Sequence, residues 1–375
     1  MIRLNYILFI VLTFISCSAQ EEITIRKDIF GFATSNSFTY CDFSDSVLSN
    51  KIVQLSPRLL RFPGGAVGNF YHFNQKGYGL DFEEIDRYHS GKFPNRSRGL
   101  ESSRKKLSHN HDYIDDLIQL AKKIDSDVYC LINNDVMVNK NWTTPIMSAF
   151  NNKKVDIAQP LLLDFNNKDK FEYAGAAGGY IDKFGYPFCR GRIFDNIETN
   201  FGQYDNSIDI FWASGACMFV NKKCWKSLEG FDEDFFMHQE EIDFCWRAKN
   251  LDKKIMCISE SKVYHIGSGS NLSSDEKVYF NHRNSLLTLV KNIDKKKLPF
   301  VLLVRSIFEF VSIFFFLFKG KISKSMMIIK AYLKFILLFV KFYKKRNNNF
   351  SIKYYKRVSI VSDFFILGKN KFSDF

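Results

Sequence analysis

The sequence predicts a mixed α/β protein whose C-terminal helices associate with a membrane. Apolar runs of strand length and amphipathic helical patterns both occur between about residues 126 and 295. From residue 296 onward the chain is dense in aliphatic, aromatic and basic residues. The 375 residues suffice for two ordinary domains or one large one, and because 46% of them are hydrophobic we expect a substantial core rather than disorder.

Residues 1–19 predict an export signal. Arg3 precedes an apolar run over 6–15, which is the outline of a bacterial secretion signal. The phrase "FISC" resembles a lipoprotein signal, in which Cys17 would become the lipidated first residue. The alternative is an apolar anchor that is not cleaved.

Residues 20–125 form a second segment of different character. In "RLLRF" apolar and basic residues alternate as in a strand, and the Pro-Gly-Gly at 63–65 lets the backbone turn sharply after it. Residues 110–124 predict an amphipathic helix. The phrase "LRFPGG" resembles the early strands of the barrel glycoside hydrolases related to arabinofuranosidases and glucuronidases. The resemblance ends before the two catalytic carboxylates that such a barrel carries at later strands.

A new pattern begins at residue 126. The run "DVYCLI" at 127–132 predicts a buried strand, which Asn133 and Asp135 follow directly. A carboxylate at the C-terminal end of a strand in an α/β sheet lies where ligands bind. These two side chains suit contact with a ribose and the binding of a divalent cation against a diphosphate. An ordinary turn is the alternative.

The segment "GFDEDFFMHQEEIDFCWRAKN" at 230–250 concentrates acidic and aromatic residues. It predicts a loop followed by a helix with a buried apolar face. Carboxylates in the first turn of a helix are favoured by its dipole, so we expect Glu240 or Glu241 to point into a cleft. A charged capping turn is the alternative.

Further polar side chains have suitable spacing. Asp243 and Arg247 are four residues apart and would pair on one helix face. His265 ends a predicted strand and precedes a glycine-rich loop. Arg283 lies near the start of a helix predicted at 279–292, where it would suit a phosphate. Earlier in the chain, 209–225 predicts a loop and then a strand, with small residues that allow a ligand to approach the backbone.

Residues 296–375 predict helices associated with a membrane. The run at 298–321 is nearly long enough to span a bilayer, but Arg305 and Glu309 interrupt it at i, i+4, which favours an interfacial or re-entrant hairpin. Residues 326–343 predict a helix lying in an anionic membrane surface, with an apolar body and three lysines on one side: Lys330, Lys334 and Lys341. A core helix with a solvated lysine stripe is the alternative.

The net charge of +13 does not indicate nucleic-acid binding, because the positive charge is unevenly distributed. Twelve Lys or Arg residues and no acid lie between Lys319 and Arg357. We therefore expect a membrane surface, contacted through 298–357, as the partner of this charge. The eight cysteines show no CxxC spacing, so neither a zinc site nor a disulfide framework is indicated.

Five phrases, taken in order, resemble the catalytic half of family-2 inverting glycosyltransferases, especially the rhamnosyltransferase-like bacterial members. They are "LINNDVMV", "WASGACMFV", "GFDEDFFMHQEEIDFCWRAKN", "SKVYHIGSGS" and "YFNHRNSLL". The resemblance covers about residues 122–345. It implies a partial glycosyltransferase A-type (nucleotide-diphospho-sugar transferase) fold that lacks its usual first βαβ portion, with the catalytic half at 126–295. It also implies polysaccharide biosynthesis at the cytoplasmic face of the inner membrane.

The resemblance further implies roles for individual residues. Asn133, Asp135 and Arg283 would bind the diphosphate of a nucleotide-diphospho-sugar donor, and Asp135 with His265 would bind Mg²⁺ or Mn²⁺. Glu241 would deprotonate the acceptor hydroxyl for in-line attack on the anomeric carbon, with Glu240 as the alternative base. The acceptor, a glycan or a lipid-linked glycan, would contact four residues: Trp212, Gly215, Ala216 and Asp243.

Two other functions are consistent with parts of the sequence. The first is an inactive chimeric or truncated remnant exported as a lipoprotein, which the predicted signal favours because nucleotide sugars are cytoplasmic. The second is a glycoside hydrolase-like protein, which would require a paired acid and nucleophile on barrel strands.

Overall fold

The computed structural model describes residues 127–375 apart from 134, 268–272, 347–349 and 351–352, together with four short strands earlier in the chain. The chain divides into two compact units, Met1–Asp125 and Ser126–Phe375. The predicted export signal with Cys17 and the helix predicted at 110–124 lie outside the described residues. The division into four segments stays a prediction.

The four early strands form two pairs. Strand β1 (Gly31–Ala33) pairs in parallel with β2 (Leu59–Arg61), and β3 (Tyr71–His72) pairs antiparallel with β4 (Gly79–Leu80). Strand β2 lies within "RLLRF", so the strand predicted there is confirmed.

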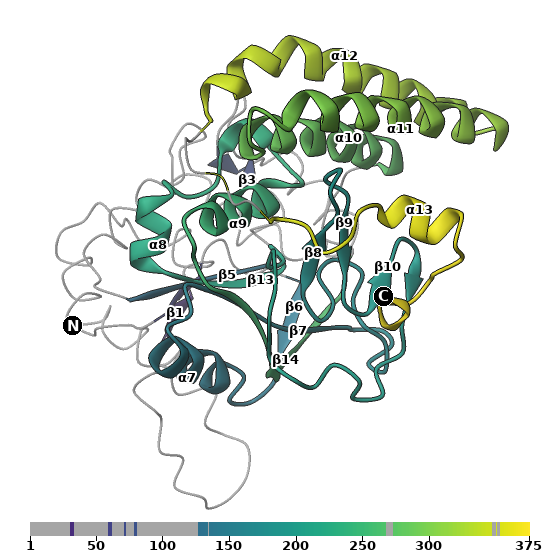
Figure 1. The fold of residues 1–375 in the computed structure, drawn as a ribbon. Coiled ribbons are helices and arrows are strands. Elements are labelled where there is room, and N and C mark those ends of the chain that lie inside the picture. The colour runs from purple at the N-terminus through teal and green to yellow at the C-terminus, as the bar shows by residue number, and fades with distance from the viewer. Residues whose placement is uncertain are drawn as a thin grey trace, which may run out of the picture. The chain divides into compact units, whose positions relative to one another are not determined.

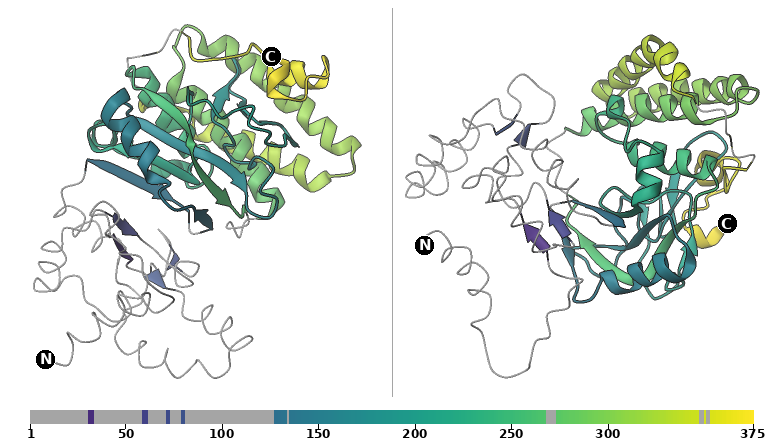
Figure 2. Two further views of the ribbon diagram at one scale, coloured as in Figure 1. Left: turned by 90° about the horizontal axis from the view of Figure 1, so that it is seen from below. Right: turned by 90° about the vertical axis from the view of Figure 1, so that its left-hand side faces the viewer.

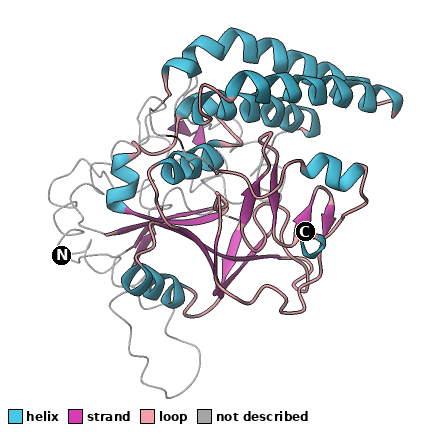
Figure 3. Ribbon diagram, in the orientation of Figure 1, coloured by secondary structure: helices cyan, strands magenta, loops and turns pink. Residues whose placement is uncertain are grey.

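A six-stranded mixed sheet forms the centre of the second unit (Figures 1 and 3), with the order β12-β14-β7-β13-β5 and with β6 paired to β14. Strands β7 and β14 run parallel, whereas β13 runs antiparallel to both β7 and β5. The carboxyl ends of β5, β7 and β14 therefore meet the start of β13 at one edge of the sheet. The strands are β5 (Val128–Ile132), β6 (Val136–Val138), β7 (Ile157–Asp164), β12 (Ile208–Asp209), β13 (Cys217–Asn221) and β14 (Ile255–His265).

Helices cover both faces of this sheet. Helix α7 (Thr143–Lys153) packs its buried Ile146 and Ala149 against one face, in a cluster with residues of β7, β13 and β14. Helix α9 (Glu240–Asn250) packs Ile242, Cys245 and Trp246 into the main core on the other side. The helix predicted within 230–250 and its apolar face are thus confirmed.

Smaller elements complete the body of the unit. A four-stranded antiparallel sheet has the order β11-β10-β9-β8. Its strands are β8 (Gly179–Ile181), β9 (Pro187–Cys189), β10 (Arg192–Ile193) and β11 (Asn196–Ile197). The short helices are α8 (Lys222–Ser227), α13 (Ile360–Phe365), η2 (Glu233–Phe235) and η3 (Phe372–Asp374).

Three long helices form a layer on the α9 side of the sheet (Figure 2). They are α10 (Ser274–Asn292), α11 (Leu298–Phe318) and α12 (Ile322–Lys344), and α10 packs against α9, α11 and α12. Helix α10 begins earlier than predicted because Ser273 and Glu276 cap it reciprocally. Among the described residues, α11 is the one helix long and apolar enough to cross a membrane.

Candidate active site

The edge where β5, β13 and β14 meet gathers most of the predicted site residues. The backbone N–H of Asn133, after β5, donates to the carbonyl of Ala216, just before β13, at 2.9 Å. The backbone N–H of Ile266, after β14, donates to the carbonyl of Asp135 at 3.1 Å. Three segments far apart in the sequence are thus joined at one place.

Asp135 and His265 are in direct contact there. His265 Nε2 lies 3.1 Å from Asp135 Oδ1, and the second oxygen of Asp135, Oδ2, is buried without a protein partner. On the other side of the imidazole, Nδ1 lies 3.1 Å from Oε1 of Glu172. Burial lowers the pKa of His265, but the hydrogen bonds and charges of Glu172 and Asp135 outweigh it, so that the pKa is raised.

The two candidate bases occupy the first turn of α9. Glu241 lies beside Gly215 in the loop before β13. A Cβ added to this glycine would be 3.8 Å from the Cβ of Glu241. Each carboxylate has one oxygen, Oε2, that is buried without a protein partner. Burial, followed by the charge of Glu240, raises the pKa of Glu241 to about 8. Burial also raises the pKa of Glu240.

The loop before α9 has an unusual backbone. Phe236, His238 and Gln239 have φ angles of 65°, 66° and 75°, values that residues other than glycine rarely adopt. Asn284 of α10, which is fully buried, fixes this conformation: its Nδ2 donates to the carbonyls of Phe235, Met237 and His238 at 3.0, 2.7 and 2.8 Å. Residues held in such backbone conformations cluster at functional sites.

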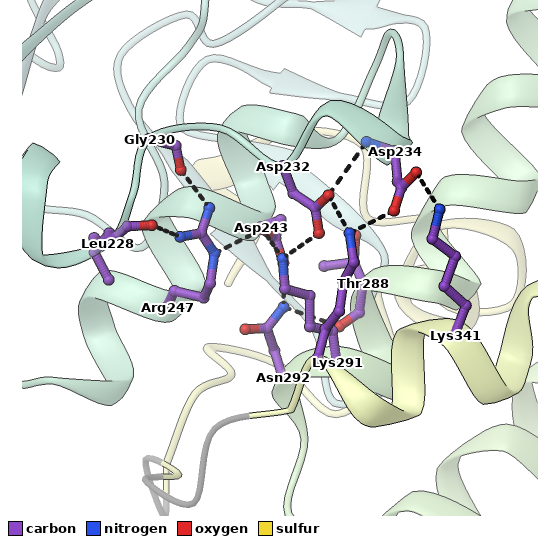
Figure 4. A network of polar contacts seen from close by, with 11 residues as sticks. Leu228, Gly230, Asp232, Asp234, Asp243, Arg247, Thr288, Lys291, Asn292 and Lys341 are labelled. Carbon is purple, nitrogen blue, oxygen red and sulfur yellow. Dashed lines mark hydrogen bonds and ion pairs between the residues drawn. The ribbon is translucent and has the colours of Figure 1, made fainter.

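Asp243 is buried in a network of polar side chains. Its carboxylate has no exposed surface, and Figure 4 shows it between Arg247, Lys291 and Asn292. The Arg247 Nε donates to it at 2.8 Å, which confirms the predicted pair. Lys291 Nζ and Asn292 Nδ2 donate to it at 2.9 and 2.7 Å. The acceptor contact predicted for Asp243 is therefore not supported by this arrangement.

The same network joins the loop that carries Asp232 and Asp234 to α12 through ion pairs with lysines. Asp232 Oδ2 accepts from Lys291 at 2.7 Å, and its Oδ1 accepts from Lys345 at 2.6 Å. Asp234 accepts from Lys341 at 2.6 Å and also from Lys345. Although burial of Asp232 opposes it, the bonds from Lys291 and Lys345 lower the pKa of that carboxyl to about 2. The acids at the start of the segment thus join α9, α10 and α12.

Two other predicted ligand contacts are core residues. Trp212 is 4% exposed, lies against Gly179 and donates its Nε1–H to the carbonyl of Tyr180 at 2.9 Å. Arg283 is 7% exposed and lies in the middle of α10 because the helix begins at Ser274. Its guanidinium donates to the Phe235 carbonyl and to the Asn284 side chain. The phosphate contact predicted for Arg283 and the acceptor contact predicted for Trp212 are therefore not supported.

Sequence reasoning missed Glu172 and Asn284. Glu172 stands in a loop without a motif, and nothing in its neighbourhood signals the contact with His265. Asn284 follows Arg283 in the phrase "YFNHRNSLL", so the segment was recognised, but the contact of Asn284 with the loop before α9 was not predicted.

No protein-family model matches the chain. Three curated relatives do. The O-antigen biosynthesis protein RfbC of Myxococcus xanthus is 24% identical over 40% of this chain and 12% of its own length. The low-salt glycan biosynthesis hexosyltransferase Agl10 of Haloferax volcanii is 24% identical over 44% of this chain and 52% of its own. The rhamnosyltransferase WbbL of Escherichia coli is 21% identical over 43% of this chain and 60% of its own.

The chain thus spans at most about three fifths of the length of these relatives. Among solved structures, GalNAc-T7 with UDP, GalNAc and Mn²⁺ matches 49% of this chain and 35% of its own with a TM-score of 0.35 and 14% identity, which is too distant to support an inference. The three relatives, all at low identity, fit a family-2-like glycosyltransferase.

Proposed function

We propose that the chain is a metal-dependent glycosyltransferase that moves a hexosyl or rhamnosyl group, with inversion, from a nucleotide-diphosphate donor to a glycan or lipid-linked acceptor. The convergence of three segments at one sheet edge supports this proposal most strongly. The Asn133 N–H binds the Ala216 carbonyl, and the neighbouring Gly215 lies beside Glu241. This supports placing the proposed donor-binding residues and the proposed base in one site.

The residues at this edge fit a divalent cation. Asp135 supplies a carboxylate with one oxygen free of protein partners, and His265 supplies an imidazole nitrogen directed at the same carboxylate. Among the described residues no three His, Cys, Asp or Glu side chains are grouped to bind a metal by themselves. Mg²⁺ and Mn²⁺ in nucleotide sites often have few protein ligands, since substrate phosphates supply the others. When bound, such an ion supplies Lewis-acid stabilisation of the leaving diphosphate.

Glu241 is the base in this proposal. Its raised pKa brings proton transfer close to neutral pH, where a general base is most effective. The unpartnered Oε2 would accept the proton of the acceptor hydroxyl while the acceptor oxygen bonds to the anomeric carbon. The diphosphate departs from the opposite side of that carbon, which inverts its configuration. Gly215 and Ala216 remain candidates for acceptor contact, and Glu240 remains the alternative base.

We also propose that α11 and α12 lie in an anionic membrane surface. Arg305 and Glu309 pair at 2.9 Å and are each 2% exposed, so the polar face of α11 turns toward the protein. The sequence has no acid between Lys319 and Arg357, and the acids of the loop before α9 pair with only two of the lysines in this region, Lys341 and Lys345. Many exposed apolar side chains lie on both helices, among them Phe310, Phe314, Phe318, Leu333, Leu337 and Val340.

Three features expected from the sequence stay predictions. They are the lack of the usual first βαβ portion, the location at the cytoplasmic face of the inner membrane, and export as a lipoprotein. The comparisons give no support to the inactive remnant or to the glycoside hydrolase.

The Glu241→Gln variant tests the proposal. With UDP-, GDP- and dTDP-sugars as donors and a bacterial lipid extract as acceptor, we expect release of nucleoside diphosphate to fall by about 10²–10⁴-fold in this variant. Binding of nucleoside diphosphate should stay as in the wild type. The exposed Glu233, changed to Gln, is the control. Loss of turnover in Glu240→Gln instead would assign the base to Glu240, and unchanged turnover in both variants would contradict the mechanism.

A further inference from the structure

Glu172 is a buried carboxylate that the proposed chemistry does not yet use. The residue is 4% exposed and lies in the loop after β7. The backbone N–H of Glu172 donates to the carbonyl of Leu162, a residue of β7, at 3.0 Å. Because an isolated buried carboxylate is costly, its two oxygens require partners. Both have one.

The two partners of Glu172 are different in kind. Oε2 accepts from the backbone N–H of Ala174, which is part of the fixed fold. Oε1 lies 3.1 Å from Nδ1 of His265, the side chain that ends β14. Gly267, two residues after His265, also lies close to Oε1: a Cβ added to this glycine would be 3.6 Å from that oxygen. The backbone therefore holds Glu172 on one side. On the other side its carboxylate lies beside Nδ1 of His265, which is buried and has no aligned hydrogen-bond partner among the described residues.

This arrangement determines which imidazole nitrogen is free to bind a cation. A carboxylate facing Nδ1 can only accept, so it favours a proton on Nδ1, and Asp135 Oδ1 favours one on Nε2 in the same way. A cation bound by Nε2 would require the lone pair of that nitrogen, and the proton of the neutral ring would then stay on Nδ1 beside Glu172. Histidines that bind metals typically donate their other ring N–H to a carboxylate in this way.

We propose that Glu172 is a positioning residue that fixes the orientation and tautomer of His265, so that Nε2 and Asp135 together receive the divalent cation that accompanies the donor diphosphate. This inference rests on the proposed function, because it assumes that His265 binds the cation. Glu172 itself does not contact the cation.

The substitution Glu172→Gln separates this role from simple space filling. The Gln side chain has one carbonyl oxygen, which the Ala174 N–H requires, so its amide N–H₂ must face Nδ1 of His265. That contact makes Nδ1 the acceptor and places the ring proton on Nε2, where it blocks cation binding. Loss of such a partner typically weakens metal affinity by about 10–100-fold.

The experiment measures Mn²⁺ binding to the full chain in the presence of UDP, GDP or dTDP, by the electron paramagnetic resonance signal of free Mn²⁺. We expect Glu172→Gln to bind Mn²⁺ about 10–100-fold more weakly than the wild type. Glu198→Gln is the matched control, because the Glu198 carboxylate accepts from Tyr204 and from the Phe372 N–H rather than from His265. It should bind as the wild type does.

A second readout follows the proton itself. In ¹⁵N spectra of histidine-labelled protein with saturating Mg²⁺ and the diphosphate, Nδ1 of His265 should carry the ring proton in the wild type, whereas in Glu172→Gln the proton should move to Nε2. His265→Gln identifies the signal among the seven histidines of the chain. Should Glu172→Gln not fold, Glu172→Asp replaces it, since the shorter carboxylate cannot reach both partners and should also weaken Mn²⁺ binding.

The outcomes are distinguishable. If the wild type does not bind Mn²⁺ with any of the three diphosphates, the proposed function is wrong. If the wild type binds but Glu172→Gln binds equally, with Nδ1 still protonated, only the role of Glu172 is wrong.

Discussion

Glu240 and Glu241 at the start of α9 present two carboxylates in a site with little solvent. Because burial raises the pKa of Glu241 to about 8, the active, deprotonated base becomes more abundant as the pH rises toward that value. We expect kcat to increase between about pH 6 and 8, in proportion to the deprotonated fraction. A kcat that is flat over this range, or that falls, would contradict the assignment of Glu241 as the base.

The same shift makes a prediction for stability. The pKa of Glu241 is higher in the folded protein than its ordinary value of 4.5, so the folded state binds the proton more tightly. Its contribution is therefore fully present below about pH 4.5 and is lost as the pH rises through about 8. Relative to Glu241→Gln, which does not titrate, the free energy of unfolding of the wild type should decline over that interval in urea titrations. An increase with pH would have the wrong sign.

Asn284 shows how one amide can hold a functional loop. The change Asn284→Asp keeps the shape of the side chain but replaces a donor that serves three carbonyls with an acceptor. We expect a loss of about 1–3 kcal/mol in the free energy of unfolding, and a lower kcat because the backbone before Glu240 and Glu241 relaxes. Asn281→Asp, on the exposed face of the same helix, should change neither. Equal effects of the two variants would contradict the role of Asn284.

At the scale of elements, α11 and α12 provide the surface for membrane association. We expect the chain to float with vesicles of anionic lipid and to remain unbound with neutral ones. Leu337→Glu, at a position 76% exposed on α12, should reduce the bound fraction because it places a carboxylate in the apolar face. Phe201→Glu, at a position 85% exposed outside these helices, is the control. Equal binding of both variants would contradict a docking role for this face.

The elements themselves were largely predictable because local patterns determine them. The strand expected at 127–132 is β5, the strand ending at His265 is β14, and the helix expected in 230–250 is α9. The helix expected at 279–292 was placed too late because the capping pair of Ser273 and Glu276 was not recognised. The error moved Arg283 from the first turn of a helix to its buried middle.

At the scale of the whole molecule, contacts between distant segments were the least predictable. The order of strands suggested that Asp135 and His265 would meet, and they do, at 3.1 Å. The sequence could not show which acid would enter the core, since Asp243 lies among carboxylates of the same type and only the positions of Lys291 and Asn292 distinguish it. The contact between Glu172 and His265 likewise depends on two segments whose proximity no local pattern encodes.

The central claim is that Asp135 belongs to a site for a metal and a nucleoside diphosphate. Calorimetric titration of the purified chain with UDP, GDP and dTDP, with Mn²⁺ and with chelator, tests it most directly. Asp135→Ala is the variant, and the exposed Asp195, changed to Ala, is the matched control. We predict saturable binding of at least one diphosphate that requires Mn²⁺, persists in Asp195→Ala and is lost in Asp135→Ala. No binding by the wild type, or equal binding by Asp135→Ala, would contradict the claim.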